Sequence, residues 1–390
     1  MGKNKLNELR NKIDDIDKKL IDLFEERMNI AKDIGAYKKE NNIAIFNGER
    51  EKEVLQKNVN RLKDKNLKLY AEEFFQNTMS ISRKYQGDKI LNKNLAKEKE
   101  DKIYKNKKDR LIFNEKNKIG FQGVRGSFSE QALLDYFGEE VDTFNFETFE
   151  DVFVNLENKI IDYAILPLEN SSTGAISDVY DLLRKYGFYI VGEKCIKVEH
   201  NILGIKGSKI KNIEEIYSHP QAFQQSNKFL KDYKEVKLIP YYNTAISAEY
   251  IKNQKDLSKG CIASKRASEI YGLEILEKNI NNNKNNHTRF IIIGRDLIND
   301  VNNNKISVVF SLEHKVGTLY NALKYFSENH INMLKIESRP TGDKNWTYFF
   351  YIDFEGNSQN KEVSKAIELI KQNSQYFKIL GEYIKDQVCE

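Results

Sequence analysis

The sequence has little cysteine, little excess of charge of one sign, and no long apolar run. Its three cysteines, Cys195, Cys261 and Cys389, show neither metal-ligand spacing nor even pairing, which favours reduced thiols. The net charge of +5, from 63 basic and 58 acidic residues, is too small to indicate a nucleic-acid partner. No apolar run approaches the ~18 residues that span a bilayer, and the polar N-terminus is unlike a signal peptide. These absences predict a cytoplasmic protein with no metal site, no membrane contact and no nucleic-acid partner.

Length and apolar content predict a globular protein of several parts. The apolar fraction is 40%, and 22 Phe and 21 Tyr are present, which is unlike a disordered chain. A chain of 390 residues can form two or three domains, each with its own core.

Apolar residues at three-four spacing predict a single long helix at the N-terminus, with a coiled-coil-like seam. The seam residues are Leu6, Leu9, Ile13, Ile16, Leu20, Leu23, Ile30 and Ile34. Arg27 interrupts the seam, and Lys38 projects from nearly the same face three turns later. A buried arginine is costly unless an anion meets it, so the two cations predict an enclosed anion site. The alternatives are an arginine that reaches solvent and one held in an internal salt bridge.

A third arginine, Arg10, also lies among the seam leucines. It precedes Arg27 by seventeen residues, which is roughly 25 Å along a helix, so one small ligand cannot reach both in one chain. In an antiparallel dimer, Arg10 of one protomer could complete the site of the other. Two shorter helices are expected next, one from the N-cap Asn47 to about residue 63 and one over about 67–86. Ser82 and Gln86 share a face near the end of the latter.

These helices resemble the all-helical chorismate mutases over residues 4–87. The residues that carry the resemblance are Arg10, Arg27, Lys38, Arg50, Glu51, Ser82 and Gln86. The resemblance implies a pericyclic conversion of chorismate to prephenate, without an acid, base or nucleophile. Such a reaction needs a folded conformer of a dianion and stabilisation of charge on the breaking ether oxygen.

The resemblance also implies a role for each residue of the set. Arg27 and a partner-chain Arg10 would hold the two carboxylates, while Lys38 and Gln86 would donate to the ether oxygen. Glu51 would take the hydroxyl, and supporting contacts would come from Arg50 and Ser82. Asn47 stands where the family commonly has Asp, and it could both cap its helix and contact the hydroxyl.

The middle of the chain changes character twice. Residues 88–117 are dense in Lys, Asn and Glu, which indicates a solvated linker. From residue 118 short strands alternate with helices, which is typical of an α/β fold with parallel strands. The expected strands are 119–121, 142–146, 161–166, 190–198, 213–217, 237–239, 260–263 and 289–294. Since residues 118–297 are more than one sheet needs, two lobes with a ligand cleft between them are expected.

Three polar stretches of this region, 167–174, 218–221 and 287–290, are candidates for one binding site. The first follows an apolar strand that is expected to end at Pro167, and a helix follows it. Free N–H groups at that helix start would suit an anion; alternatively, the Ser and Thr side chains only cap the helix. Ligands of such sheets collect at the carboxyl ends of strands. The three stretches lie at such ends, except that Thr288 precedes its expected strand. Ser127 and Glu130 form a capping-box pattern before another helix.

Four motifs in this region resemble the prephenate dehydratases, in order and in spacing, over residues 118–297. They are Gly123-x-x-Gly126-Ser127, Pro167-x-Glu169-Asn170-Ser171, Ser218-His219-Pro220-Gln221 and Thr288-Arg289-Phe290. The resemblance implies a two-lobed fold similar to periplasmic binding proteins. It also implies a reaction in which prephenate loses carbon dioxide and hydroxide to give phenylpyruvate, driven by aromatisation.

By this resemblance Thr288 is the catalytic hydroxyl, and Arg289 is either a carboxylate anchor or an organiser of the site. The side chains that would line the cleft are Glu169, Asn170, Ser171 and Thr173, with Ser127 and Thr244 at its edges. His219 is either a general acid or, as we favour, a structural histidine beside Pro220.

A function of another class would be a ligand-binding sensor without chemistry, with the N-terminal helices acting only as a dimerising coiled coil. Fold alone does not decide between the two. The Thr288-Arg289-Phe290 motif and the seam position of Arg27 favour an enzyme.

The C-terminal segment is expected to form a ferredoxin-like βαββαβ unit. Its elements are the strand 306–311, helix 319–326, strands 331–337 and 348–354, helix 363–370 and strand 377–383. The unit resembles an ACT domain, an amino-acid-sensing module, and the alternative is a structural appendage. Two segments match those through which such domains bind phenylalanine in dehydratases, namely Gly317-Thr318-Leu319-Tyr320 and Glu337-Ser338-Arg339-Pro340. A glycine at the helix start allows close approach of a ligand.

The sequence therefore predicts a multidomain protein. An all-α mutase domain would occupy residues 1–87, a linker 88–117, a two-lobed α/β dehydratase domain 118–297, and an α+β ferredoxin-like ACT domain 305–384. The expected function is two consecutive steps of phenylalanine biosynthesis, from chorismate to phenylpyruvate, under feedback inhibition by L-phenylalanine. No metal or organic cofactor is expected, and the shared mutase site implies a homodimer or a higher homo-oligomer.

Overall fold

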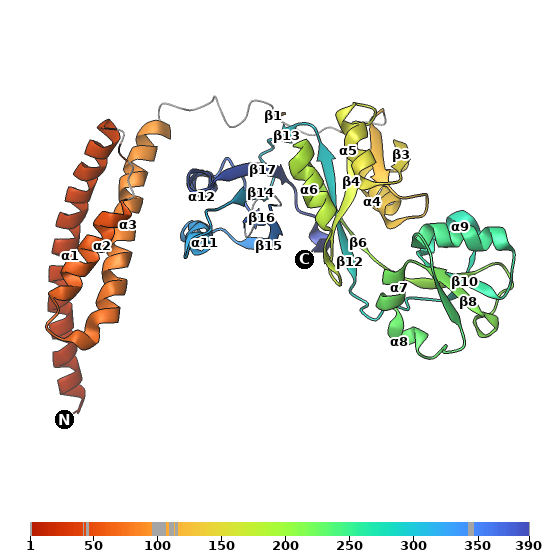
Figure 1. Cartoon of the computed structure of the whole chain (residues 1–390), viewed down its shortest axis with the longest axis horizontal. Helices are drawn as coiled ribbons and strands as arrows, with labels where there is room; N and C mark the ends of the chain where they lie inside the picture. Colours follow the sequence, from red (N-terminus) through yellow and green to blue (C-terminus); the bar gives the residue numbers. More distant parts are fainter. Residues whose placement is uncertain are drawn as a thin grey trace. The chain divides into compact units, whose positions relative to one another are not determined.

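The computed structural model describes residues 2–41, 43, 47–95, 107–108, 113, 116–341 and 347–389. The chain divides into two compact units, Met1–Lys105 and Asn106–Glu390, whose elements are labelled in Figure 1. Of the linker expected over 88–117, residues 96–106, 109–112 and 114–115 lie outside the described residues. None of the helices in the described ranges is both long enough and apolar enough to cross a membrane.

The first unit consists of helices, as expected. They are α1 (Gly2–Glu40), α2 (Gly48–Asn60) and α3 (Lys68–Leu95), with a short 3-10 turn at Lys65–Leu67. Asn47 caps α2, because its Oδ1 accepts from the backbone N–H of Arg50 at 3.0 Å. The third helix passes its expected end at residue 86 and continues into the segment expected to be a linker. A polar segment without proline is free to continue a helix.

Helix α1 packs against α3 through a narrow stripe, not through the expected seam. Met28, Ala31 and Gly35 are buried, and a Cβ at Gly35 would lie 2.9 Å from Gln86 Cγ. The seam residues are instead 44–61% exposed. The seam is therefore left largely exposed within the described residues.

The second unit contains two large sheets among the described residues, which confirms the two-lobed expectation. The longer sheet has the order β15 (Met333–Pro340), β16 (Tyr348–Glu355), β14 (Lys305–Ser311), β17 (Tyr376–Tyr383), β6 (Tyr189–Lys197), β12 (His287–Gly294), β4 (Tyr163–Asn170), β2 (Lys118–Gln122) and β3 (Asp142–Phe146), with β5 (Gly174–Ala175) beside β4. The other has the order β11 (Glu274–Glu277), β7 (Asn201–Gly204), β10 (Lys259–Ala263), β8 (Glu215–Ser218) and β9 (Lys237–Pro240). A small pair joins β1 (Lys107–Lys108) and β13 (Leu297–Ile298).

The expectation of parallel strands is correct only in part. Strands β3, β2 and β4 are parallel, as are β10, β8 and β9. Strand β12, however, runs antiparallel to both β4 and β6, and β7 runs antiparallel to β10 and β11. Alternation along the sequence cannot reveal the direction of a strand that returns from the other lobe. The strands β7 and β11 were not expected from the sequence.

Helices cover the sheets of the second unit (Figure 1). In the first lobe they are α4 (Phe128–Phe137), α5 (Phe149–Glu157) and α6 (Ser177–Tyr186), and in the second α7 (Pro220–Gln225), α8 (Asn227–Leu230), α9 (Thr244–Gln254) and α10 (Lys265–Tyr271). Strand β4 lies between two cores. Ala164, Leu166 and Leu168 pack with residues of α5 and α6, whereas Ile165 packs with Leu133 of α4. This alternation is what a strand buried on both faces requires.

The C-terminal part has the expected βαββαβ order. Its helices are α11 (Thr318–Glu328) and α12 (Lys361–Gln372), and a last 3-10 turn spans Gln387–Cys389. Its sheet is continuous with that of the first lobe, because β17 pairs with β6 at Gly381 and Ile190. A Cβ at Gly381 would lie 2.1 Å from the carbonyl oxygen of Ile190, so only glycine permits this junction.

The cysteines differ from one another. Cys195, on β6, is disulfide-bonded, whereas Cys261 is free and buried in the second lobe. The expectation of reduced thiols is therefore wrong for Cys195. Spacing along the chain carries no information on which residues the fold brings together.

Candidate active sites

The cation site of the first unit centres on Arg27, which is half-buried. Its Nη1 donates to the carbonyl oxygen of Thr78 at 3.3 Å and to Ser82 Oγ. Both partners are neutral, and burial lowers the pKa of Arg27. Because a guanidinium keeps its charge in proteins, Arg27 is a partly desolvated cation with no carboxylate partner among the described residues. The internal salt bridge considered from the sequence is therefore not what the structure shows.

Three further predicted residues surround this helix pair. Gln86 on α3 is buried, approaches Gly35 of α1, and its Oε1 has no hydrogen-bond partner among the described residues. Glu51 of α2 forms an ion pair with Arg83 of α3, a residue that sequence reasoning missed. Lys38 is half-buried near the end of α1. Helix α1 thus supplies cations, α2 a carboxylate and α3 an amide to the same packed bundle.

Three other predicted residues lie elsewhere in the unit. Arg50 is exposed and pairs with Glu53 of its own helix at 2.6 Å. Asn47 caps α2, as described above. Arg10 is exposed on the same uninterrupted helix as Arg27, seventeen residues away, so the separation expected from the sequence applies.

The site of the second unit forms where β4 ends beside the start of β12. Antiparallel pairing places Asn170 opposite Thr288 and Glu169 opposite Arg289. The sequence predicted that this strand ends at Pro167, but β4 continues to Asn170. The register shifts beside Phe290, which pairs with Pro167, so a bulge accommodates the missing N–H of the proline. Thr288 accordingly lies within its strand and not before it.

The amide of Asn170 fixes the orientation of the Thr288 hydroxyl. Its Oδ1 accepts from the backbone N–H groups of Ser172 at 2.9 Å and Thr173 at 3.2 Å. Its Nδ2 therefore faces the other way and donates to Thr288 Oγ1 at 2.9 Å. Since Thr288 Oγ1 accepts in this bond, its own hydrogen is directed elsewhere.

The same bonds show that the polar stretch after β4 does not cap the helix that follows it. The N–H groups of Ser172 and Thr173 are occupied by Asn170, and β5 intervenes before α6. Helix α6 has Ile176 at its N-cap, without a side-chain cap. The stretch therefore forms a turn around Asn170 and does not cap the helix, since β5 separates the two.

Asn286 is a member of this cluster that sequence reasoning missed. It is 1% exposed, and its Oδ1 accepts from Asn170 Nδ2 at 2.8 Å and from Ser172 Oγ at 3.0 Å. Its own Nδ2 is buried and has no hydrogen-bond partner in the described ranges. Ser171 adds a further tie, because its Oγ accepts from the N–H of His287 at 2.9 Å. In the sequence, Asn286 is hidden in a run of asparagines that looks like an ordinary polar loop.

Arg289 is surrounded by three carboxylates. Its Nε donates to Glu169 Oε1 at 2.6 Å and its Nη1 to Glu193 Oε2 at 3.1 Å. Its Nη2 lies 2.8 Å from Asp353 Oδ2, a close ion pair that is not aligned as a hydrogen bond. The side chain is 5% exposed, and each of its three nitrogens lies within 3.1 Å of a protein carboxylate oxygen.

Two lysines complete this charged cluster. Lys305 Nζ lies 2.7 Å from Glu193 Oε2, and Lys335 pairs with Glu169. Three cations and three carboxylates thus balance one another, and the partners of Arg289 and the lysines come from β4, β6 and β16. Of the six residues, sequence reasoning found only Glu169 and Arg289, since the others lie in strands whose motifs gave no indication of charge pairing.

Arg289, Glu169 and Asp353 are charged at neutral pH. Burial acts to raise the pKa of Glu169 and Asp353, but the neighbouring Arg289 and lysines outweigh it and leave both values below the ordinary range. Burial acts to lower the pKa of Arg289, but the facing carboxylates raise it well above its usual value. Each charge is therefore stabilised by the others.

Ser127, His219 and Thr244 lie at helix starts. Ser127 Oγ accepts from the N–H of Glu130 at 3.3 Å, and His219 Nδ1 caps α7 by accepting from the N–H of Gln221 at 3.3 Å. Burial lowers the pKa of His219. The helices follow β2, β8 and β9, so all three residues lie at carboxyl edges of parallel strands. Within the described residues none of them bonds to the Asn170 cluster.

The two effector segments expected in the C-terminal part lie on α11 and β15. Gly317 precedes α11 with a φ of +83°, which favours glycine, and Thr318 Oγ1 donates to two backbone carbonyls. Leu319 and Tyr320 follow in the first turn, and Tyr320 is 68% exposed. The other four residues, Glu337, Ser338, Arg339 and Pro340, are the last of β15, which is longer than expected.

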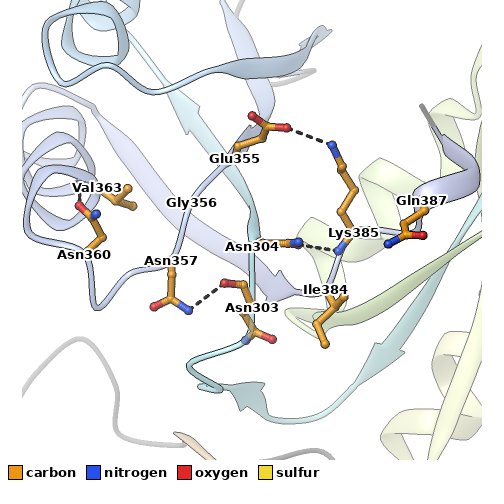
Figure 2. A pocket seen from close by; sticks show the side chains of 10 residues that line it. All are labelled: Asn303, Asn304, Glu355, Gly356, Asn357, Asn360, Val363, Ile384, Lys385 and Gln387. Carbon is orange, nitrogen blue, oxygen red and sulfur yellow. Dashed lines mark hydrogen bonds and ion pairs between the residues drawn. The ribbon is translucent and has the colours of Figure 1, made fainter.

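A separate cavity of about 850 Å³ lies in the C-terminal part (Figure 2). Its polar groups bond to one another: Asn357 Nδ2 donates to the carbonyl oxygen of Asn303 at 2.9 Å, and Lys385 Nζ to Glu355 Oε1 at 3.0 Å. None of the residues expected to bind substrate or effector lines it. It is therefore not part of either candidate site.

Comparisons with known proteins match this organisation. Family models match chorismate mutase type II over residues 9–87, prephenate dehydratase over 119–297 and the ACT domain over 306–368. Over 397 residues the chain is 35% identical to the bifunctional chorismate mutase/prephenate dehydratase of Buchnera aphidicola subsp. Acyrthosiphon pisum (strain APS). That match covers 99% of this chain and 98% of the relative.

Two solved structures are similar over more than two thirds of the chain. A prephenate dehydratase from Arthrobacter aurescens in complex with L-Phe has a TM-score of 0.63 at 25% identity, over 69% of this chain and 90% of that one. The quorum quenching acylase GqqA has a TM-score of 0.65 at 28% identity, over 70% of this chain and 100% of that one. Because one fold can host different reactions, the residues of the site decide the function.

The charged cluster predicts a loss of stability in acid. Glu169 and Asp353 have a folded pKa below the ordinary value, so their contribution is present at neutral pH and is lost below about pH 4. Asp353→Asn should lower the free energy of unfolding by about 3–5 kcal/mol at pH 7, because it leaves Arg289 under-paired. The difference from the parent should shrink as the pH falls, in urea unfolding at several pH values. Asp135→Asn, on the exposed side of α4, is the control; parallel pH curves for Asp353→Asn and the parent would contradict the interpretation.

Proposed function

The chain belongs to the bifunctional chorismate mutase/prephenate dehydratase family, and we propose that it performs both reactions in turn. The helical unit converts chorismate to prephenate, and the two-lobed part converts prephenate to phenylpyruvate. We propose residues 1–87 for the mutase, 118–297 for the dehydratase and 305–384 for a phenylalanine-sensing part. The cytoplasmic location expected from the sequence stays a prediction.

The observation that supports the mutase site is the charge of Arg27. It is half-buried, its bonding partners are neutral, and a dianionic substrate would supply the missing counter-charge. Gln86 has a buried amide close to the same helix pair, which suits donation to the ether oxygen of the breaking bond. In this proposal Lys38 also donates to that oxygen and Glu51 binds the hydroxyl. The bundle then acts by holding one folded conformer and stabilising charge.

The exposed seam supports a dimer that shares its mutase sites. Its leucines and isoleucines form an apolar stripe along α1 that only Arg27 interrupts among the seam positions, and such a stripe is normally covered. A second copy laid antiparallel would cover it and bring its Arg10 near Arg27 of the first chain. In each site, Arg27 of one chain would then bind one carboxylate of the substrate and Arg10 of the other chain would bind the second.

The observation that supports the dehydratase site is the bond from Asn170 Nδ2 to Thr288 Oγ1. It leaves the hydrogen of the Thr288 hydroxyl free to donate to the departing hydroxyl of prephenate. An alcohol is a weak acid, so we propose a hydrogen bond that stabilises the leaving hydroxide while water supplies the proton. Loss of carbon dioxide then gives the aromatic ring. The carboxylates of prephenate would meet the helix starts at Ser127 and Thr244.

The bonding of Arg289 and His219 supports organising roles for both. Arg289 already engages three carboxylates, so a substrate carboxylate would have to displace one of them. We therefore propose that it organises the site and does not anchor substrate. His219 uses Nδ1 to cap α7, and its lowered pKa leaves it neutral at pH 7, which suits the structural role.

The two activities should separate by mutation, because the sites lie in different units. Thr288→Ala should reduce prephenate turnover by about 10²–10³-fold while leaving chorismate turnover unchanged. Arg27→Ala should abolish chorismate turnover and leave prephenate turnover unchanged. Absorbance assays with each substrate test both; loss of both activities in one folded variant would contradict the assignment. A parent protein that turns over neither substrate would instead favour the sensor.

Asn170→Asp tests the direction of the hydrogen bond to Thr288. An aspartate carboxylate accepts and cannot donate, so it would take the Thr288 hydrogen that the proposal reserves for the substrate. The dehydratase kcat should fall by about 10²-fold with little change in KM. The matched control is Asn155→Asp on α5, whose side chain bonds only within its helix in the described structure. An unchanged kcat in Asn170→Asp would show that donation from Asn170 is not needed.

Subunit exchange tests the shared mutase site. Arg10→Ala and Arg27→Ala proteins should each be inactive as mutases. After mixing with demonstrated exchange, each mixed dimer should contain one intact site, so about a quarter of all sites should be active. Activity that stays at zero in the exchanged mixture would indicate sites built within single chains.

A further inference from the structure

Strand β15 contacts the dehydratase site at two points on one face. Lys335 pairs with Glu169, and Arg339 Nη2 lies 2.9 Å from Asp181 Oδ2 on α6. Side chains alternate along a strand, so residues 335, 337 and 339 share that face. Glu337 lies between the two contacts and belongs to the proposed effector segment. One strand therefore carries both the effector segment and two contacts to the catalytic lobe.

These contacts lie on either side of the catalytic turn. Glu169 directly precedes Asn170, whose amide orients Thr288. Helix α6 begins at Ser177, directly after the turn and β5, and Asp181 lies one turn further on. Strand β15 thus holds the segment between residues 169 and 181 at both ends. A shift of β15 would therefore change the position of the turn without any direct contact between β15 and Thr288.

Lys335 lies in a half-enclosed position that suits this role. Its side chain is 16% exposed, and its Nζ lies 5.2 Å from the centroid of the Tyr180 ring. The hydroxyl of Tyr351 donates to the carbonyl oxygen of Tyr180 at 3.2 Å, which fixes this part of α6 against β16. An ion pair in such a place contributes more than one in solvent. When Lys335 withdraws, Glu169 retains only Arg289.

The position of β15 in the sheet allows it to move. Among the described strands it pairs with β16 alone, at the end of the strand order. An edge strand breaks fewer backbone hydrogen bonds when it shifts than a central strand does. The central strands β4 and β12 stay in place through their own ladder and through Arg289. Movement can therefore be confined to β15 and the turn it contacts.

We propose that Lys335 is a positioning residue of the dehydratase site, and that phenylalanine bound at residues 337–340 inhibits by breaking its contact with Glu169. The proposal rests on the proposed function, which assigns the effector to that segment. Phenylalanine must bind more tightly to the arrangement in which the Lys335–Glu169 pair is broken, because differential affinity is the only means by which a ligand shifts a conformational equilibrium. Glu169 then keeps one cation, so activity falls without disappearing.

The test uses the full-length protein and the variants Lys335→Met and Lys335→Arg. Lys335→Met should bind phenylalanine as the parent does, by calorimetry, because Lys335 lies outside the effector segment. Its kcat/KM for prephenate should equal that of the phenylalanine-saturated parent, and added phenylalanine should inhibit it about tenfold less, within the range usual for coupled sites. Lys335→Arg, which keeps the positive charge, should be inhibited by phenylalanine as strongly as the parent. Lys371→Met, an exposed lysine on α12, is the control for loss of a charge.

A double-mutant cycle separates this role from a merely structural one. Once Glu169→Gln has removed the carboxylate charge, Lys335→Met should change kcat and inhibition no further. Should Lys335→Met fail to fold by circular dichroism, Lys335→Gln replaces it in both experiments. If the Lys335 variant binds phenylalanine and is inhibited by the same factor as the parent, the proposed coupling is wrong. If the parent does not bind phenylalanine at all, the effector assignment itself fails, and this proposal with it.

Discussion

The pairing of Arg289 with three carboxylates is the interaction on which the second unit depends. A buried guanidinium is tolerated only when its charge is balanced, and here the balance comes from Glu169, Glu193 and Asp353. Those carboxylates lie on β4, β6 and β16. One side chain of β12 therefore fixes the strand that carries Thr288 against both of its neighbours and against the C-terminal part.

The two arginines of the proposed sites show opposite uses of one side chain. Arg289 is fully paired, so it sets the geometry of the protein around it. In the part of the chain that the structure describes, Arg27 has only neutral partners, so its charge remains available to an anion. Burial is needed in both cases, because the interaction energy between two charges is larger where little water surrounds them. The presence or absence of a counter-charge then changes the energy of the arginine strongly. Whether an arginine organises or binds thus depends on the carboxylates within its reach.

The continuous sheet gives the C-terminal part a direct mechanical connection to the strands around Arg289. Gly381 allows β17 to lie against β6. This places Asp353 of β16 within reach of Arg289 and Lys305 of β14 within reach of Glu193. A regulatory part attached only by a flexible linker could not hold charges in register at distances near 3 Å. The charged cluster therefore depends on this one close backbone approach.

The sequence by itself determined the long helix, the βαββαβ order, the two lobes, and the motif residues Asn170, Thr288 and Arg289. Those features depend on local periodicity and on short motifs, which a chain carries in its linear order. The tertiary structure decided that β12 is antiparallel to β4, that Asn286 completes the cluster, and that Glu193, Lys305, Lys335 and Asp353 surround Arg289. Strand direction and charge pairing join residues more than a hundred positions apart in several cases, and no local pattern encodes which distant side chain meets which.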